Sequence, residues 1–314
     1  MDPLSSVLSL LKPHSHVSGR FNIGRRQSIL FPSYDGIKCY AVISGTCWLT
    51  QTDADPLLLR EGDCFLLPSG KPFALATDKS ARPVEFQTLL AALYKGGPGL
   101  KTGEPACSLA GGHFVLDGNP ADLLLGFLPT VVHLHSEEEK LAVRWSLERM
   151  RDELRNERLG SFLIVQQLAY TMLVQALRVH LTQASSHATG WLYAINDPQL
   201  KTAIMSIHAN PAGAWSVKDL AQQVGMSRSI FALKFKEKVG ETPMEYLTRW
   251  RMLLAGDRLT SSTEPILSIA LSLGYESESS FGKAFKRVMG SPPRRYSRQR
   301  DLHGAIPKRE LRWS

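Results

Sequence analysis

The sequence predicts an α+β protein of two domains, in which an N-terminal β-barrel with a following helical pair precedes a C-terminal all-α domain. Three observations predict this fold class. Short apolar runs separated by turn residues fill residues 19–93, apolar residues at helical spacing continue from residue 136 almost to residue 296, and the helical part contains a repeated motif. Several short strands at such spacing are typical of a barrel or sandwich. A chain of 314 residues is long enough for two or three cores.

The expected strands are short and are bounded by Gly, Pro and Asp. They are IKCYAVI and TCWLT, separated by Gly45, then PLLL, DCFLLP, FALAT and VEFQTLL. A Gly- and Pro-rich loop at residues 96–112 ends this region, and the stretches HFVLDG and FLPTVVHLH are expected to close the barrel. Regular spacing of this kind favours a closed all-β unit.

Two helices follow the barrel. Ser136 with Glu139 three residues later forms a capping box. A helical stripe is expected to run to about residue 158, and its members are Leu141, Trp145, Leu147 or Glu148, and Leu154. A second helix covers residues 162–181 with a nearly heptad-like apolar spacing. The pair is either a dimer interface or a cover packed on its own barrel.

A motif near the C-terminus occurs twice, over residues 221–246 and 270–296. Each copy reads Ala-x3-Gly, then Phe-x3-Phe, four residues, and Gly-x2-Pro-x2-Tyr. The first Gly can take the left-handed conformation that ends a helix, and a following Ser caps a second helix whose two Phe share one face. This is the pattern of a helix-turn-helix, whose second helix can enter a DNA major groove. A lone copy is more often an ordinary helix pair, so the repetition is what favours DNA binding.

The connection between the two copies is itself helical. Residues 243–259 begin with Pro243 in a first helical turn and carry an apolar stripe. A helix of this length spans about 25 Å. It is therefore expected to hold two recognition helices about one duplex turn apart, which is roughly 34 Å.

The net charge of +8 is carried by one segment of the chain. Residues 1–135 contain 11 Lys and Arg against 11 Asp and Glu, and residues 136–190 contain 7 of each kind. Residues 191–314 contain 19 against 11. A basic region joined to a neutral remainder favours contact with a phosphate backbone. A solvated basic surface without a partner is the alternative that charge alone leaves open.

The sequence does not favour a membrane protein or a secreted one. The longest apolar stretch, residues 123–132, contains Gly126 and Pro129 and is too short to span a membrane. No basic segment precedes the first apolar residues, which argues against a signal peptide. We therefore expect a cytoplasmic protein.

No cofactor or metal is expected. The four cysteines are too far apart for a zinc site and are expected to be small buried hydrophobes; they are Cys39, Cys47, Cys64 and Cys107. His133 and His135 form a His-x-His pair, but two imidazoles without further ligands are a weak metal signal.

The residues from 215 to 296 resemble the AraC/XylS family of bacterial transcription regulators. The most specific matches lie in the second copy: GYES, F-x3-F-K-R and the final G-x-x-P-x-x-Y. In the N-terminal part, GDCFLLPSG resembles a motif of the cupin superfamily. Metal-binding cupins have a His where this chain has Phe73, so the likeness is to the fold and argues against a metal. Nearly the whole chain resembles AraC/XylS regulators with a cupin-type regulatory domain, more specifically in its C-terminal part than in its N-terminal part.

Taken together, the patterns and the resemblance predict five segments. They are a cupin-like regulatory domain at 1–135, a helical pair at 136–184, a linker at 185–190, a double helix-turn-helix domain at 191–300 and a disordered tail at 301–314.

The resemblance also implies a DNA-binding unit of seven helices, of which the third and sixth lie in successive major grooves. The residues it places toward the bases are Arg228, Ser229, Ala232, Leu233, Glu278, Ser279, Gly282 and Lys283, and those toward phosphates are Lys236, Lys238, Lys286 and Arg287. Leu233 departs from the family, which usually has Arg there. Because Leu can contact only a thymine methyl or pack, the first helix is expected to read fewer bases or different ones.

We therefore expect a sequence-specific regulator of transcription that binds double-stranded DNA, forms a homodimer and has RNA polymerase as a candidate partner. Its barrel is expected to sense a small molecule, with the candidate pocket residues Arg20, Arg25, Arg26, Tyr40, Trp48 and Phe73. An alternative is redox sensing by thiol oxidation at Cys39, Cys47 or Cys64. A cupin enzyme fused to a DNA-binding module is a further alternative, which the lack of histidines in the barrel strands disfavours.

Overall fold

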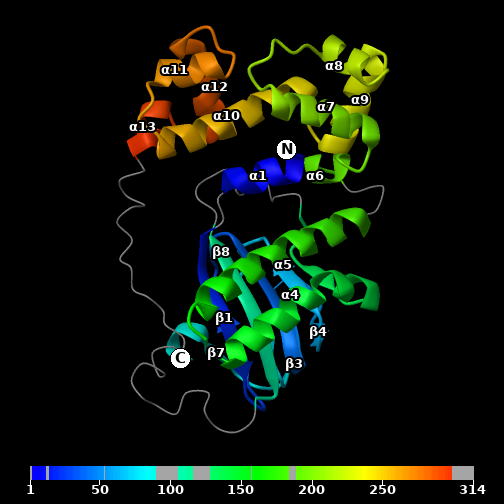
Figure 1. The fold of residues 1–314 in the computed structure, drawn as a ribbon, viewed down its shortest axis with the longest axis vertical. Helices are drawn as coiled ribbons and strands as arrows, with labels where there is room; N and C mark the ends of the chain where they lie inside the picture. Colours follow the sequence, from blue (N-terminus) through cyan, green and yellow to red (C-terminus); the bar gives the residue numbers. More distant parts are fainter. Residues whose placement is uncertain are drawn as a thin grey trace. The chain divides into compact units, whose positions relative to one another are not determined.

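The computed structural model describes residues 2–11, 14–52, 54–89, 105–115, 128–156, 158–183 and 189–298. They form two compact units (Figure 1). One unit holds the strands and the helices α4 and α5, and the other holds α1 and the helices from α6 onward. The two-domain α+β fold predicted from the sequence is confirmed, with a curled sheet in one unit and helices in the other.

The strands of the first unit are mostly four to fifteen residues long and mostly antiparallel. They are β1 (His14–Ile23), β2 (Ser28–Phe31), β3 (Ile37–Gln51), β4 (Leu57–Arg60), β5 (Cys64–Leu67), β6 (Phe73–Ala76), β7 (Pro83–Glu85), β8 (Cys107–Val115) and β9 (Val132–Leu134).

Strand β3 takes part in both sheets of the barrel. Its first half pairs with β5 and β8, and its second half pairs with β4 and β6. The predicted break at Gly45 is wrong, because the strand continues through this residue. Gly45 has φ 78°, and a Cβ there would lie 2.0 Å from the Ala106 carbonyl oxygen. A register shift between Val42 and Ser44 marks the bend that carries one strand from sheet to sheet.

Strand β8 corrects a second expectation. The loop predicted over residues 96–112 ends early, because a nine-residue strand begins at Cys107. Its residues are buried on both faces, since β8 lies between β1 and β3 with the barrel core on one side and helices on the other. The strand predicted at VEFQTLL is shorter than expected and ends at Glu85.

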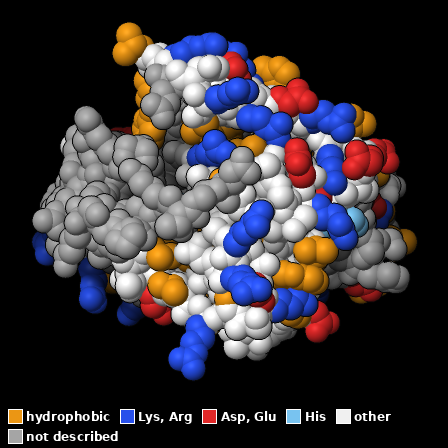
Figure 2. Space-filling model, turned by 90° about the horizontal axis from the view of Figure 1, so that it is seen from below, with side chains coloured by type: hydrophobic (Ala, Val, Ile, Leu, Met, Phe, Trp, Pro, Cys, Tyr) orange, Lys and Arg blue, Asp and Glu red, His pale blue; other side chains and the backbone are white. Residues whose placement is uncertain are grey.

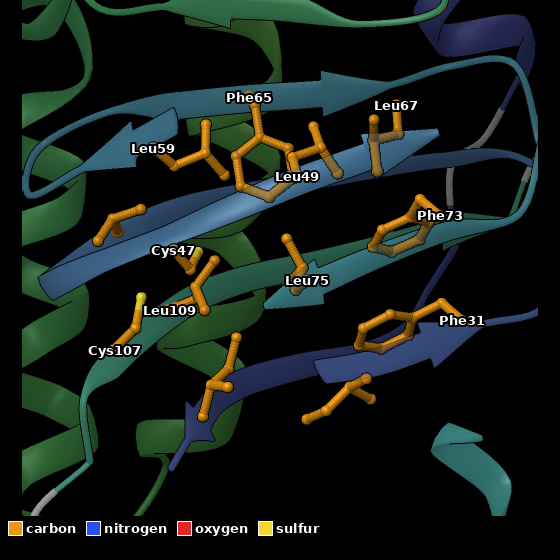
Figure 3. Close-up of a cluster of buried hydrophobic side chains, with 13 residues drawn as sticks. Phe31, Cys47, Leu49, Leu59, Phe65, Leu67, Phe73, Leu75, Cys107 and Leu109 are labelled. Carbon is orange, nitrogen blue, oxygen red and sulfur yellow. The ribbon is translucent and has the colours of Figure 1, made fainter. Parts of the chain in front are cut away.

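The barrel interior is a closely packed apolar cluster drawn in Figure 3. Cys47 and Leu49 from β3 face it together with Phe65 from β5. Phe31 and Phe73 stack with ring centroids 4.5 Å apart and planes 3° from parallel. The two sheets therefore share one core, as the alternation of inward and outward residues requires.

Helices α4 (Glu137–Asn156) and α5 (Ser161–Gln183) cover one face of the sheet (Figure 1). The predicted capping box is confirmed: the Ser136 N–H donates to Glu139 Oε2 at 2.7 Å, and the Glu139 N–H donates to Ser136 Oγ at 3.2 Å. By length and composition α5 could cross a membrane. Its buried residues recur at helical spacing against the sheet, however, as in the core helix of a globular domain.

The stripe predicted for α4 is wrong at its first two positions, Leu141 and Trp145. Leu141 is 59% exposed and Trp145 is 64% exposed, whereas Val143, Leu147 and Met150 are buried. The helix is therefore turned so that two large apolar side chains point away from the sheet.

The second unit consists of helices, whose bounds follow in chain order. They are α1 (Pro3–Leu11), α6 (Trp191–Ala194), α7 (Pro198–Ala209), α8 (Val217–Gln223), α9 (Arg228–Val239), α10 (Pro243–Ser261), α11 (Ile266–Ser272), α12 (Glu278–Met289) and α13 (Pro293–Arg298).

Helix α1 packs on α7 and α10, with Leu4, Val7 and Leu8 buried. It therefore lies with the C-terminal helices, although its residues fall inside the segment 1–135 expected to be regulatory. Helices α7 to α13 form the seven-helix arrangement that the family resemblance implies.

The repeated motif gives the same packing in both copies. Phe231 and Phe235 lie 5.6 Å apart, and the ring of Tyr246 meets Phe235 edge-on at 5.8 Å. In the second copy, Tyr296 meets Phe285 edge-on at 5.3 Å. The Tyr of each motif thus packs against the second Phe of the pair and completes the small core of that copy. This contact explains the fixed spacing from Phe to Tyr.

Candidate nucleic-acid interface and barrel interior

Helix α9 is the second helix of the first helix-turn-helix. Ser227 caps it by accepting from the Ile230 N–H at 3.3 Å, and Gly240 ends it with φ 91°. Because Phe231 and Phe235 hold one face in the core, the opposite face is exposed. Arg228, Ser229 and Leu233 are on that exposed face, while Ala232 is partly buried.

Helix α12 repeats this geometry in the second copy. Ser277 caps it, and Gly290 ends it with φ 76°. Ser279 and Lys283 are exposed, whereas Gly282 is partly buried and has no neighbouring atom within 4 Å of where a Cβ would be. That open space lets another backbone approach this face closely.

The basic residues on the two helices differ in their exposure and in their ion pairs. Among the ion pairs of the described residues, none includes Lys283. Lys236, Lys286 and Arg287 are exposed near the helix ends, and Lys238 is partly buried. Glu278 lies 3.2 Å from Arg294, an exposed pair that is worth little in stability but lowers the negative charge presented by α12.

Lys234 shows why sequence spacing alone does not identify contacts with DNA. Its ammonium lies 2.6 Å from Asp197 and donates to Gln199 Oε1 at 3.0 Å. This basic residue of α9 therefore joins its helix to the start of α7 rather than facing outward. Ile230, 60% exposed beside Leu233, is an apolar residue of the face that the sequence expectations omitted.

Helix α10 joins the two copies, as Figure 1 shows. Its Arg251 donates from Nε to the Pro211 carbonyl at 2.6 Å and from Nη2 to the Gly213 carbonyl at 2.9 Å. The same guanidinium lies 5.6 Å from the ring of Tyr275, in the turn of the second copy. One side chain thus connects the segment before the first motif with the turn of the second.

Charge is mixed elsewhere on the surface. On the face seen in Figure 2, Lys and Arg side chains stand among Asp, Glu and apolar ones. A mixed face of this kind is typical of solvated protein surface.

The candidate effector residues do not form one site. Arg20 lines a groove of about 340 Å³ beside α4 together with Ser44, Arg151 and Arg155. Arg25 and Arg26 are exposed in the turn after β1.

The three aromatic candidates are also divided. Tyr40 and Phe73 pack in the barrel core. Trp48 alternates with the core residues Cys47 and Leu49 and so faces outward, where Lys79 Nζ lies 3.4 Å from its ring centroid.

The four cysteines are buried thiols that lie in two pairs. Cys39 lies beside Cys64, and Cys47 lies beside Cys107. Burial and the Cys64 neighbour raise the pKa of Cys39, and the hydrogen bond with Cys107 together with burial raises the pKa of Cys47. A raised pKa keeps a thiol protonated and less reactive.

His133 of the His-x-His pair contacts a buried carboxylate. His133 Nε2 lies 3.0 Å from the buried Asp63, which is also 3.0 Å from Lys140 Nζ. The two imidazoles stack at 4.8 Å. Within the described part of the chain, no group of three or more His, Cys, Asp or Glu side chains could hold a metal ion.

Two polar side chains of the barrel were not anticipated. Lys38 and Gln51 are buried at opposite ends of β3, with 8% and 6% of their surface exposed. The alternation in IKCYAVI places Lys38 on the same face as Tyr40 and Val42, which was the available signal.

Comparison with known proteins agrees with both units. Residues 2–182 match a family described as Cupin, and residues 220–299 match one described as Helix-turn-helix domain. An AraC-like transcription regulator of Streptomyces lividans is 40% identical over 298 residues, covering 94% of this chain and 98% of that protein. Another from Streptomyces antibioticus is 39% identical over 302 residues, with the same coverage.

Among solved structures, a transcriptional regulator with an AraC-type DNA-binding domain from Chromobacterium violaceum is similar. It is 29% identical, covers 36% of this chain and 98% of that one, and has a TM-score of 0.33.

A cupin domain joined to two exposed recognition helices defines the class of DNA-binding transcription regulators. Within that class, the chain belongs to the AraC-like transcription regulators, since the match to the S. lividans and S. antibioticus proteins runs over nearly its whole length.

Proposed function

We propose that the cupin domain of this regulator senses a small molecule and thereby changes how α9 and α12 bind DNA. The observation that carries the proposal is the similarity of α9 and α12. Both helices have the same buried positions and the same caps, so each presents the same face to solvent. The segment boundaries at residues 135, 184, 190 and 300 are part of the proposal. The sensing step is a shift between two arrangements of the protein that differ in DNA affinity.

Each helix face is assigned two kinds of contact. The residues of the first two turns of each helix read bases: Arg228, Ser229, Ala232, Leu233, Glu278, Ser279, Gly282 and Lys283. The basic residues near the ends, Lys236, Lys238, Lys286 and Arg287, bind phosphates. Phosphate contacts supply much of the affinity and base contacts supply the sequence preference.

A homodimer through α4 completes the assembly. Leu141 and Trp145 are one helical turn apart on the exposed face of α4. A second copy that covered this pair would bury apolar surface now in contact with water. RNA polymerase is the further partner proposed for a regulator of promoters, the cytoplasm is its proposed location, and no catalytic activity is assigned.

Thiol sensing is the second candidate function, because the cysteines lie in two neighbouring pairs. Their burial and the raised pKa values of Cys39 and Cys47 work against rapid oxidation. Mild oxidation should shift DNA affinity, and substitution of either pair by Ser should abolish the shift, if this candidate is right. Unchanged affinity after oxidation sinks it.

The test of the main proposal is genome-wide mapping of the DNA that the protein binds, followed by affinity measurements on a recovered site. The four assigned phosphate contacts would weaken binding roughly a hundred-fold between 50 and 200 mM salt. An affinity that does not change with salt would contradict the assigned phosphate contacts. Genes beside the mapped sites would then indicate which small molecules to test.

A further inference from the structure

One end of the barrel interior contains a buried ammonium. Lys38 is 8% exposed, and its Nζ lies 5.0 Å from the ring of Phe31, 4.6 Å from Tyr34 and 5.2 Å from Phe73. Among the described residues, no carboxylate forms an ion pair with it and no acceptor takes a hydrogen bond from it. Three aromatic faces attract the cation, but they leave its three N–H donors unused.

A second polar group without a partner borders the same ring. Gln51 is 6% exposed, and neither Oε1 nor Nε2 of its amide has a hydrogen-bond partner among the described residues. Gln51 stands directly opposite Phe73 in the ladder of β3 and β6. Opposed residues project to the same face of a sheet, so the amide and the ring share the interior side.

Leaving both groups without partners is unfavourable. A buried polar group without a hydrogen bond costs free energy, and a buried charge costs more. Burial lowers the pKa of Lys38 to about 8, which is the signature of an ammonium removed from water without a compensating anion. A packed apolar core would be more stable with aliphatic residues at these positions, so their presence calls for a ligand that supplies the missing partners.

We propose that the effector is a small organic acid, whose carboxylate pairs with the Lys38 ammonium while its apolar body lies against the rings of Phe31 and Phe73. The Gln51 amide provides a further hydrogen bond. This inference rests on the proposed function, because it assumes that the cupin domain is the sensor, and it goes further by naming the chemical class and the residues that recognise it.

Binding requires the core to open at one side. Phe31 lies between Phe73, at 4.5 Å, and Phe86, at 4.7 Å. Phe73 is 1% exposed, whereas Phe86 is partly buried, so moving Phe86 sacrifices less packing. Phe31 belongs to β2 and Phe73 to β6, and an acid inserted here would shift two paired strands.

The experiment uses the full chain and three acids: phenylacetate, cyclohexanecarboxylate and hexanoate, each compared with its amide. Calorimetric titration at pH 7 measures binding, and thermal unfolding without ligand measures stability. The variants are Lys38→Met, which keeps the length of the side chain without the charge, and Gln51→Leu. Lys79→Met is the matched control, since Lys79 lies over the Trp48 ring on the outer face of the same domain.

At least one acid is expected to bind wild type about tenfold or more tightly than its amide, as a charge-assisted hydrogen bond requires. Lys38→Met should abolish that preference, Gln51→Leu should weaken acid binding, and Lys79→Met should leave it unchanged. Without ligand, Lys38→Met should unfold about 2–4 °C higher than wild type, because it removes an unpaired buried charge.

Several outcomes overturn the inference. A thermal midpoint of Lys38→Met below that of wild type overturns it, because the ammonium and its rings would then be a structural element. Failure of all six compounds to bind wild type also overturns it, as does equal binding of acids and amides. Amide binding that survives Lys38→Met and alters DNA affinity leaves the proposed sensor in place with a neutral effector. If an acid binds at Lys38 and DNA affinity does not change, the ligand class stands but the proposed sensing function fails.

Discussion

In α9, Phe231 and Phe235 are buried, as Phe281 and Phe285 are in α12, and both helices begin at a Ser cap and end at a left-handed Gly. On the exposed faces the correspondence ends. Leu233 of α9 occupies the place of Lys283 in α12. The interior of the motif is fixed by packing, whereas the outward face is free to change with the DNA sequence that it meets.

The two copies also differ in what supports them. Tyr246 of the first copy lies 2.8 Å from His208 Nε2, and this imidazole stacks on Trp250 at 3.8 Å. Tyr296 of the second copy packs beside Gly256, where a Cβ would come within 3.5 Å of its ring. The Tyr of the first copy therefore contacts a titratable imidazole, whereas the Tyr of the second copy contacts a glycine of α10.

The largest expected effect tests whether the two interiors are equivalent. Phe235→Ala and Phe285→Ala should each lower the free energy of unfolding by about 3–5 kcal/mol, because each removes a fully buried ring. Urea denaturation followed by circular dichroism measures both. Losses that differ by more than about 2 kcal/mol between the copies would break the equivalence; Phe→Leu at each site is the milder control.

The second-largest expected effect is a loss of stability at acid pH that arises in the first copy and not in the second. Burial lowers the pKa of His208 to about 3, so the folded protein keeps this imidazole neutral while the unfolded chain protonates it near pH 6.5. The unfolded state then binds more protons, and stability is lost as pH falls from about 6.5 toward 3. At pH 5 the loss is about 2 kcal/mol.

The measurement is the free energy of unfolding at pH 7 and pH 5 for wild type and His208→Phe. The variant should keep the stack on Trp250 and lose most of the pH dependence attributable to this site. An equally steep pH dependence in the variant would show that another group is responsible.

The exposed faces should differ in their contribution to DNA binding. Lys283→Ala should weaken binding to a mapped site by about 1–3 kcal/mol, since it removes an exposed basic side chain at a proposed base-facing position. Leu233→Ala should cost less, because it removes only apolar contact. Fluorescence anisotropy at fixed salt compares them, and equal or reversed losses would show that the two helices are ranked wrongly.

The smallest expected effect concerns the bases that α9 reads. Ile230 and Leu233 are exposed apolar residues on this helix, so thymine methyl groups are their natural contacts. Replacing thymine by deoxyuridine in the half-site of α9 should weaken binding by about 0.8 kcal/mol for each methyl lost. The same replacement in the half-site of α12 is the control and should have less effect.

Local patterns in the sequence predicted much of the fold because they depend on neighbouring residues. The caps at Ser136 and Ser227, the left-handed Gly225 and Gly274, and the paired Phe positions all follow from spacing along short stretches of the chain. The break expected at Gly45 failed because pairing of β3 with four other strands outweighed a local turn signal.

The sequence by itself determined the class of protein, since the repeat, the charge of residues 191–314 and the cupin-like turn are all properties of short stretches. Tertiary structure decided which side chains meet. It turned Leu141 and Trp145 outward, paired Lys234 with Asp197 and placed Lys38 among three rings drawn from separate segments. The physical reason is that burial and partners depend on residues distant in the chain, which no local pattern encodes.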